Sequence, residues 1–303
     1  MYQETEIARF DAAAALLPQR LRGKALALPP ETRRTAEEIR LRTGGPLAVL
    51  LPEGELSLGE TVTPEDLETL CDIATECSRY AAAETLRAGY VTVRGGYRVG
   101  FCGTAVMKGG ESTAMKHFSS AAIRVSRQRR GIADALLPRL FRSGALESTL
   151  LLSPPGGGKT TLLRDLVRGL SLGSASHSPQ RVALIDERSE VAAMYSGRPQ
   201  LDVGPRTDVL DACPKALGIP MVLRAMNPQV IAVDEITAAE DVEAAVQAAG
   251  CGVSLLATAH AADPEELAAR PLYRRLLAAG VFRLAVRISR QGAERRYDVE
   301  ELG

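Results

Sequence analysis

Residues 153–161 read SPPGGGKTT, and this stretch decides the fold of the chain. An apolar strand over residues 149–152 precedes it, and residues 161–167 follow it as a helix. A glycine-rich turn between strand and helix, closed by a lysine and a hydroxyl residue, is the pattern of a phosphate-binding P-loop. We therefore expect nucleotide contacts from Pro155, Gly156, Gly157, Gly158, Lys159, Thr160 and Thr161.

Ser153 is the one departure from the P-loop consensus, which has glycine at this position. A residue with a Cβ atom disfavours positive φ, so the geometry of the opening turn is the point to inspect. The alternative is a glycine-rich loop that binds no ligand. The complete series of strand, turn, lysine, hydroxyl and helix argues against that alternative.

An acidic pair follows another apolar strand farther along the chain. Residues 230–233 are Val-Ile-Ala-Val, and Asp234 and Glu235 come directly after them. Hydrolases with a P-loop hold Mg²⁺ with such a carboxylate and orient the attacking water with a second group. We expect Thr160 and Asp234 to hold the metal, Asp234 through water, and Glu235 to polarise the nucleophile. The pair is common by itself, but downstream of a P-loop it predicts hydrolysis.

Polar residues also follow two other predicted strands. A strand over 182–185 runs into Asp186 and Glu187, and a strand over 255–258 leads to His260. Ligands of doubly wound sheets bind where the strands end. Glu187 is therefore a candidate second acidic group, and either Thr258 or His260 is a candidate sensor of the γ-phosphate. The same residues could instead cap a helix or lie in an ordinary solvated loop. The sequence alone does not decide between these structural roles and a role at the nucleotide site.

Three arginines, Arg188, Arg206 and Arg224, are candidates for a charge-stabilising group donated across a subunit interface. Each is also a candidate surface or salt-bridging arginine, and the sequence does not choose among them. The chain contains neither an Asn/Thr-Lys-x-Asp guanine signature after the P-loop nor a transporter signature of the Leu-Ser-Gly-Gly-Gln type. ATP with Mg²⁺ is therefore favoured over GTP.

The pattern of apolar residues changes in the middle of the chain. From residue 148 onward apolar runs alternate with helical segments, which predicts βαβ units around a buried parallel sheet. Before that, residues 90–101 alternate at period two around a Gly-Gly turn, which predicts an antiparallel hairpin. We expect an α/β protein with a C-terminal RecA-like P-loop ATPase domain over 144–303. A smaller N-terminal α+β domain for assembly or regulation would occupy 1–143.

Two more elements are predicted outside the motifs. Residues 63–66 read Thr-Pro-Glu-Asp, a capping-box-like start for a helix that we expect to reach about Gly89. Residues 282–288 and 295–299 flank a Gln-Gly pair and are expected to form a closing hairpin.

The composition is that of an ordinary globular protein. The chain has 303 residues, 46% of them hydrophobic and 24% charged, with 37 basic and 37 acidic side chains. The balanced charge gives no global reason to expect nucleic acid or an acidic surface as a partner. No stretch reaches the roughly 18 apolar residues of a membrane helix, so we expect a cytoplasmic protein that is at most peripheral at a membrane.

The motifs together resemble those of the stage III sporulation protein AA family of endospore-forming bacteria, relatives of the type II and type IV secretion ATPases. The similarity covers nearly the whole chain and is carried by residues 38–42, 95–100, 123–125, 131–134, 159–165, 186–190 and 233–236. Secretion ATPases have an acidic box, an arginine-containing helix and a histidine box. Glu187, Arg224 and His260 occupy these places here, and the resemblance implies catalytic roles for them.

The resemblance also implies how the protein works in the cell. It implies a hexameric ring on the cytoplasmic, mother-cell side of the membrane. Such a ring would be a motor for the channel between mother cell and forespore, with membrane-embedded channel proteins as partners.

A rival hypothesis is a nucleic-acid-binding ATPase, because similar modules occur in plastid and cyanobacterial proteins joined to single-strand-binding domains. Segment 116–142 carries seven basic residues against one acidic residue, Asp134. Only Phe118 and Phe141 are available for base stacking, so nucleic acid is disfavoured as a partner. The segment would equally suit anionic lipid, an acidic channel tail or water. A non-enzymatic ring that nucleotide merely holds together also stays open.

Overall fold

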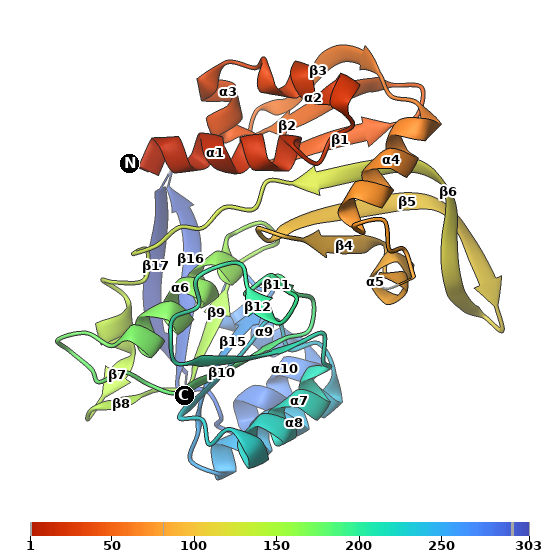
Figure 1. Cartoon of the computed structure of the whole chain (residues 1–303). Helices are drawn as coiled ribbons and strands as arrows, with labels where there is room; N and C mark the ends of the chain where they lie inside the picture. Colours follow the sequence, from red (N-terminus) through yellow and green to blue (C-terminus); the bar gives the residue numbers. More distant parts are fainter. Residues whose placement is uncertain (1, 81, 292–293, 303) are drawn as a thin grey trace. The chain divides into compact units, whose positions relative to one another are not determined.

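The computed structural model describes residues 2–80, 82–291 and 294–302 (Figure 1). The chain forms two compact units, residues 1–127 and residues 128–303. The division falls earlier than the predicted boundary at residue 144. The reason is that the segment before residue 144 packs on α6 (Lys159–Leu172) of the second unit. Its side chains in that hydrophobic cluster are Ala133, Leu136, Leu137 and Leu140.

Antiparallel strands in the order β3-β2-β1-β6-β5-β4 make the sheet of the first unit. They are β1 (Glu38–Arg42), β2 (Pro46–Leu51), β3 (Gly54–Thr61), β4 (Tyr90–Val93), β5 (Tyr97–Lys108) and β6 (Glu111–Arg124). The helices of this unit are α1 (Tyr2–Ala14), α2 (Gln19–Leu26), α3 (Pro30–Thr35), α4 (Pro64–Ala74) and α5 (Ala83–Arg87). The expected smaller α+β fold is confirmed.

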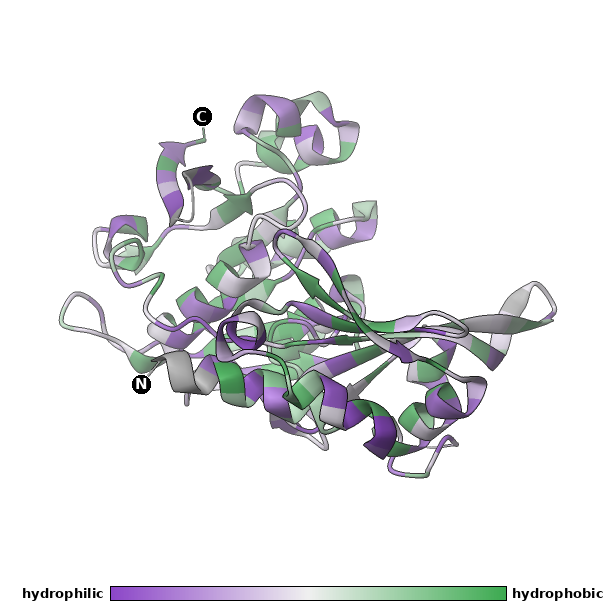
Figure 2. Cartoon of the chain, turned by 90° about the horizontal axis from the view of Figure 1, so that it is seen from above, coloured by the Kyte–Doolittle hydropathy of each residue, from purple (hydrophilic) through white to green (hydrophobic). Residues whose placement is uncertain are grey.

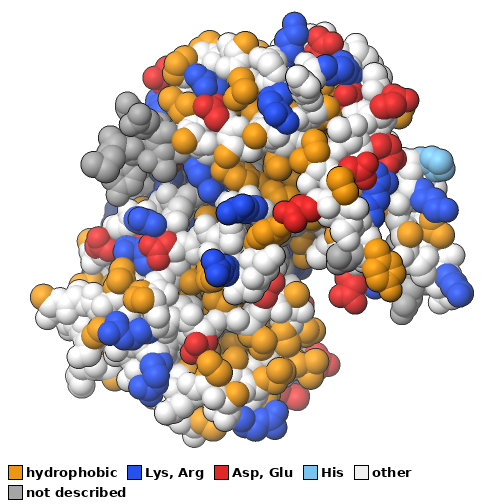
Figure 3. Space-filling model, in the orientation of Figure 1, with side chains coloured by type: hydrophobic (Ala, Val, Ile, Leu, Met, Phe, Trp, Pro, Cys, Tyr) orange, Lys and Arg blue, Asp and Glu red, His pale blue; other side chains and the backbone are white. Residues whose placement is uncertain are grey.

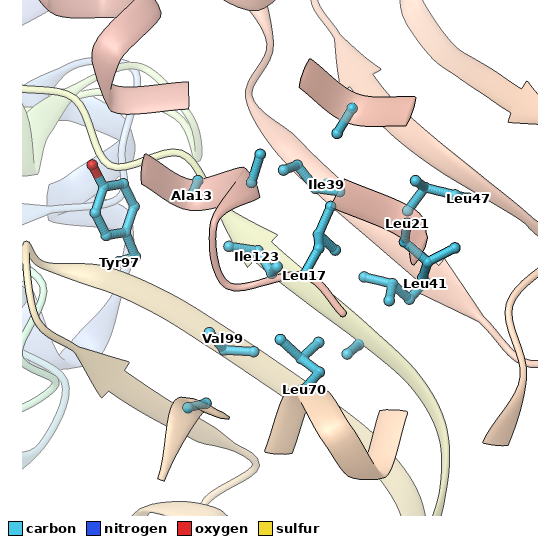
Figure 4. Close-up of a cluster of buried hydrophobic side chains, with 14 of the residues drawn as sticks. Ala13, Leu17, Leu21, Ile39, Leu41, Leu47, Leu70, Tyr97, Val99 and Ile123 are labelled. Carbon is cyan, nitrogen blue, oxygen red and sulfur yellow. The ribbon is translucent and has the colours of Figure 1, made fainter. Parts of the chain in front are cut away.

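The core of the first unit lies between its helices and one face of this sheet (Figure 4). Leu17 and Leu21 meet Ile39 and Leu41 of β1, and Leu70 of α4 closes the cluster. All five side chains are completely buried. Burial of each contributes about 1.5–3 kcal/mol, so this cluster holds the unit together.

The predicted hairpin over residues 90–101 is confirmed as β4 and β5. Gly95 and Gly96 form its turn with φ of +88° and +78°, values that only glycine adopts at low cost. β5 and β6 then continue beyond their neighbours as a two-stranded ribbon (Figures 1 and 2). Gly109 and Gly110 turn the chain at the tip of this ribbon.

Helix α4 begins as predicted and ends earlier. Thr63 Oγ1 accepts the N–H of Asp66 at 3.3 Å, and Asp66 Oδ2 accepts the N–H of Thr63 at 2.7 Å, which makes a complete capping box. The prediction of one helix to Gly89 was wrong. Glu76 and Cys77 have left-handed φ values of +49° and +59°, which break the helical hydrogen-bond ladder. α5 is a separate short helix.

The second unit contains a sheet in the order β13-β10-β14-β15-β9-β16-β17, parallel except for β17. Its strands are β9 (Thr149–Leu152), β10 (Val182–Asp186), β13 (Thr207–Asp211), β14 (Val230–Val233), β15 (Ser254–Ala259), β16 (Leu284–Gln291) and β17 (Glu294–Glu301). Short pairs are formed by β7 (Phe141–Arg142) with β8 (Ala145–Leu146) and by β11 (Met194–Tyr195) with β12 (Arg198–Pro199). The predicted parallel strands and the closing hairpin are confirmed.

Helices cover both faces of this sheet. They are α6, α7 (Lys215–Ala225), α8 (Ala239–Gly250), α9 (Pro264–Ala269) and α10 (Pro271–Ala278), with a 3₁₀ turn over Leu137–Leu140. Leu150 and Leu152 of β9 pack in the cluster with α7, α8 and α10, whereas Leu151 packs in the cluster with α6. Parallel strands end at one edge of a sheet, so the segments after β9, β10, β14 and β15 converge there.

The surface carries mixed charge. Figure 3 shows basic and acidic side chains scattered among apolar ones on the face in view. Within the described residues, no helix combines the length and apolar character needed to span a membrane.

Candidate nucleotide site

The loop between β9 and α6 has the backbone that its glycines predict. Gly156 and Gly158 have φ of +75° and +99°, and a Cβ atom on Gly157 would overlap Ser153 Oγ. Ser153 is buried and keeps a negative φ, and its hydroxyl donates to the carbonyl of Pro154 at 2.9 Å. The serine that departs from the consensus therefore fits the loop without a left-handed backbone.

Lys159 begins α6 and lies against the loop. Its ammonium donates to the carbonyl oxygens of Ser153 at 2.7 Å and Pro154 at 3.2 Å, and it lies 2.7 Å from Nδ1 of His260. Only 6% of the residue is exposed. Burial lowers the pKa of Lys159, and the carboxylate of Glu235 acts in the opposite direction.

A chain of polar contacts joins this lysine to the acidic pair. An ammonium only donates hydrogen bonds, so Nδ1 of His260 accepts from Lys159 and the ring proton lies on Nε2. Nε2 in turn lies 3.2 Å from Oε2 of Glu235. The structure thus brings together Lys159, His260 and Glu235, which come from three different strand ends.

Asp234 is fixed by hydroxyl groups from both sides. Thr160 Oγ1 of α6 donates to its Oδ2 at 3.1 Å, and Thr258 Oγ1 of β15 donates to its Oδ1 at 2.7 Å. The Thr258 hydroxyl also accepts the N–H of Glu235 at 2.9 Å. Glu235 has φ of +29°, a strained value for a non-glycine residue that these bonds hold in place.

These oxygen groups suit Mg²⁺. Mg²⁺ prefers oxygen ligands and keeps several waters, with one or two protein groups and substrate phosphates completing its shell. Thr160 Oγ1 and the Asp234 carboxylate are already adjacent at 3.1 Å, beside the loop expected to hold the phosphates. Among the residues that the structure describes, no cluster of three or more His, Cys, Asp or Glu side chains is arranged for a metal. Thr160 and Asp234 therefore fit as part of the coordination shell of Mg²⁺, and phosphate oxygens and water would supply the rest.

The two acids at the end of β10 have different surroundings. Asp186 is buried, and its carboxylate accepts the backbone N–H groups of Glu190, Val191 and Ala192 at 2.8–3.0 Å. Burial raises the pKa of Asp186, and these backbone donors act against that rise. Asp186 thus anchors the following turn. Glu187 is partly exposed and forms an ion pair with the ammonium of buried Lys215 at the start of α7.

Replacing Asp186 by asparagine should destabilise the second unit by about 2–3 kcal/mol. The amide NH₂ would face backbone donors, so buried N–H groups would lose their acceptor. The unfolding midpoint in urea measures the loss. Asp208→Asn is the matched control because Asp208 is exposed on edge strand β13. Equal midpoints for the two variants would contradict the anchoring role of Asp186.

The three candidate arginines do not lie together. Arg188 follows β10 at the edge where the P-loop lies, and it is exposed. Arg206 precedes β13, where it donates to the carbonyl of Ser171 at 3.2 Å. Arg224 is exposed in the last turn of α7, which leads to the beginning of β14. Arg224 therefore lies at the opposite edge of the sheet from Asp234, and a catalytic role for it stays a prediction that requires a second subunit.

Two residues of this region were not predicted from the sequence. Lys215 binds Glu187, and Arg295 of β17 donates from Nε to the carbonyl of Gly157 at 2.8 Å. Arg295 is 138 positions from Gly157. No local pattern reports such a contact, because it depends on the pairing of β16 with β9.

The basic segment 116–142 is shared between the two units. Four of its seven basic residues form ion pairs within the chain. These pairs are Arg124–Glu38, Arg127–Glu6, Arg130–Asp202 and Arg142–Glu301. Much of its charge is thus balanced inside the protein, which gives no support to the nucleic-acid alternative.

A parallel sheet with a P-loop after one strand and an acidic pair after another defines a RecA-like P-loop fold. Solved structures with this fold include the ATPase DotB of Yersinia pseudotuberculosis, with a TM-score of 0.60 and 15% identity over 94% of this chain and 80% of that one. The pilus retraction motor PilT, solved with ADP, has a TM-score of 0.57 and 19% identity over 88% of this chain and 80% of that one.

Sequence comparison then gives the family. The model of the family described as sporulation stage III, protein AA, matches residues 11–296. The chain is 38% identical over 277 residues to the stage III sporulation protein AA of Bacillus subtilis strain 168, covering 91% of this chain and 90% of that relative. The chain belongs to this family.

Proposed function

We propose that the chain is a Mg²⁺-dependent ATPase. The observation that carries this proposal is the connected set of Thr160, Asp234 and Glu235 beside the lysine of the P-loop. Similar solved structures include the DotB ATPases of Legionella pneumophila and Yersinia pseudotuberculosis, and the pilus retraction motor PilT was solved with ADP. Residues 155–161 are proposed to hold the phosphates through backbone N–H groups and the Lys159 ammonium.

Each side chain of the site has a proposed task. Mg²⁺, when bound, neutralises charge on the phosphates. Thr160 and Asp234 hold that metal, and Thr258 orients Asp234 and Glu235 together. Glu235 orients the attacking water and accepts its proton. Glu187 supplies a second acidic group at the site, and its position is set by Lys215.

His260 is proposed to sense the γ-phosphate. Its Nδ1 accepts from Lys159 while its Nε2 faces Glu235. When Lys159 turns to the phosphates, His260 loses that donor. Without that donor, the imidazole is free to turn and to release Glu235 from its contact with Nε2. Glu235 is then available to place the attacking water.

In the cell, the proposed ATPase is a motor for a sporulation channel or export apparatus. Membership of the stage III family and the likeness to DotB and PilT support this role. The working form is proposed to be a hexameric ring at the mother-cell face of the membrane, with Arg224 reaching a neighbouring subunit. Membrane-embedded channel proteins are the proposed partners.

Purified full-length chain should release phosphate from ATP only when Mg²⁺ is present, and chelation by EDTA should abolish the release. Its mass in solution should rise with ATP and Mg²⁺ towards a ring of about six copies, because bound ligand stabilises the state that binds it. Light scattering with and without nucleotide measures the mass. Phosphate release that is independent of Mg²⁺ would contradict the enzymatic proposal, and a mass unaffected by ATP would contradict a nucleotide-dependent ring.

A further inference from the structure

We propose that Arg295 binds the phosphates of the nucleotide, an inference that rests on the proposed ATPase function. Arg295 lies on β17 and its guanidinium contacts the P-loop from outside the motif. Arg295 belongs to the closing hairpin, whereas the other groups of the site follow β9, β10, β14 and β15.

The sheet carries this arginine to the loop. β16 runs parallel to β9, and its Arg287 pairs with Leu152, the last residue of β9. The rest of β16 therefore runs past the end of β9, at the edge where the P-loop begins. β17 returns antiparallel, with Arg295 opposite Arg290. Arg295 is thus placed about 10 Å beyond the end of β9, at about 3.3 Å per residue.

The guanidinium lies directly on the last glycines of the loop. Its Nε donates to the carbonyl of Gly157 at 2.8 Å. A Cβ atom on Gly158 would lie 2.7 Å from Nε and 3.3 Å from one terminal nitrogen of Arg295. Gly158 also precedes Lys159 at the N-terminus of α6, the 14-residue helix expected to face the phosphates. Glycine at position 158 therefore allows both the left-handed backbone and the close approach of the arginine.

The electrostatic setting favours an anion. The N-terminus of α6 is the positive end of its dipole, and the ammonium of Lys159 adds a full charge there. Arg295 adds a second cation beside the same loop, and a bound anion would offset the repulsion between the two positive groups. Arg287 and Arg296 on the same hairpin both pair with Asp298, whereas within the described part of the chain no carboxylate forms an ion pair with Arg295.

The chemistry of the side chain selects phosphate. A guanidinium has five N–H donors in a planar fork, and only Nε–H is used by Gly157. The terminal N–H groups remain for two oxygens of a phosphate, the pairing for which arginine is better suited than lysine. The ligand is thus a nucleoside diphosphate or triphosphate rather than an uncharged nucleoside.

Binding of ADP and of adenosine to the full-length chain tests the proposal by calorimetry. Arg295→Gln should weaken ADP binding by about 10- to 100-fold, the loss of a charge-assisted hydrogen bond, and leave adenosine binding unchanged. Arg295→Lys should lose less, because it keeps the charge without the fork. Arg296→Gln is the matched control: it removes the same charge from the next residue of β17, whose side chain points to the other face and pairs with Asp298.

The outcomes separate the two claims. ADP affinity equal to wild type in both Arg295 variants would overturn the assignment and leave nucleotide binding intact. Equal losses of affinity for adenosine and ADP would also overturn it. Such losses would mean that Arg295 contacts the base or stabilises the fold of the loop, and does not bind the phosphates. No ADP binding by wild type would overturn the proposed function itself. If Arg295→Gln lowers the melting temperature without nucleotide, Arg295→Lys decides the outcome.

Discussion

Lys159→Ala should weaken ATP binding by about 100-fold, because the ammonium that neutralises the outer phosphates is lost. The residue is buried, and two loop carbonyls hold its ammonium beside the loop, from where it turns to the phosphates when nucleotide binds. Titration calorimetry with ATP and Mg²⁺ measures the effect. Lys24→Ala is the control, since Lys24 is an exposed lysine of the first unit. Matching ATP affinities for the two variants would remove Lys159 from the proposed site.

The wild-type protein should also lose ATP affinity at alkaline pH, earlier than an ordinary lysine predicts. Burial lowers the pKa of Lys159 below 10.5, and only the protonated amine attracts phosphate. Affinity should therefore fall as pH rises through that lowered value. Lys159→Arg, which stays charged throughout this range, should show a flatter pH dependence. A steep fall in both proteins would assign the titration to another group.

The parts of the site formed by contiguous residues could be predicted from the sequence. The P-loop, its strand and its helix are contiguous, and Asp234 and Glu235 follow a wholly buried strand. Such segments carry their own signal, because glycine at positive φ and apolar runs leave few alternatives. Their meeting at one sheet edge follows from parallel strand order, so the contact between Thr160 and Asp234 could be expected before it was seen.

Other features depended on contacts between distant residues. The end of α4 is set by left-handed Glu76 and Cys77, two residue types that carry no strong signal for that conformation. The division of the chain near residue 128 depends on which unit the segment 133–140 packs against, and it packs on α6 of the second unit. Arg295 became visible only through strand register. In each case tertiary packing decided what local pattern left open.

Glu235→Gln should lower the rate of ATP hydrolysis by about 10²–10⁴-fold while ATP affinity stays near that of wild type. Glutamine keeps the shape of the side chain and can still contact His260, so the strained backbone at this position should be retained. It cannot accept the proton of the attacking water, which confines the defect to the chemical step. Single-turnover hydrolysis at saturating ATP, with binding measured separately, distinguishes the two steps.

The control for this change is Glu240→Gln, which removes the same charge from an exposed position in the first turn of α8. It should hydrolyse ATP at the wild-type rate. If Glu235→Gln also did so, the proton would have to pass to another carboxylate, and Glu187 is the candidate at the same edge of the sheet. Glu187 is held by Lys215 rather than by the contacts that fix Asp234, so Glu187→Gln would then carry the large loss. A defect in Glu235→Gln alone assigns the base to the residue that His260 already contacts.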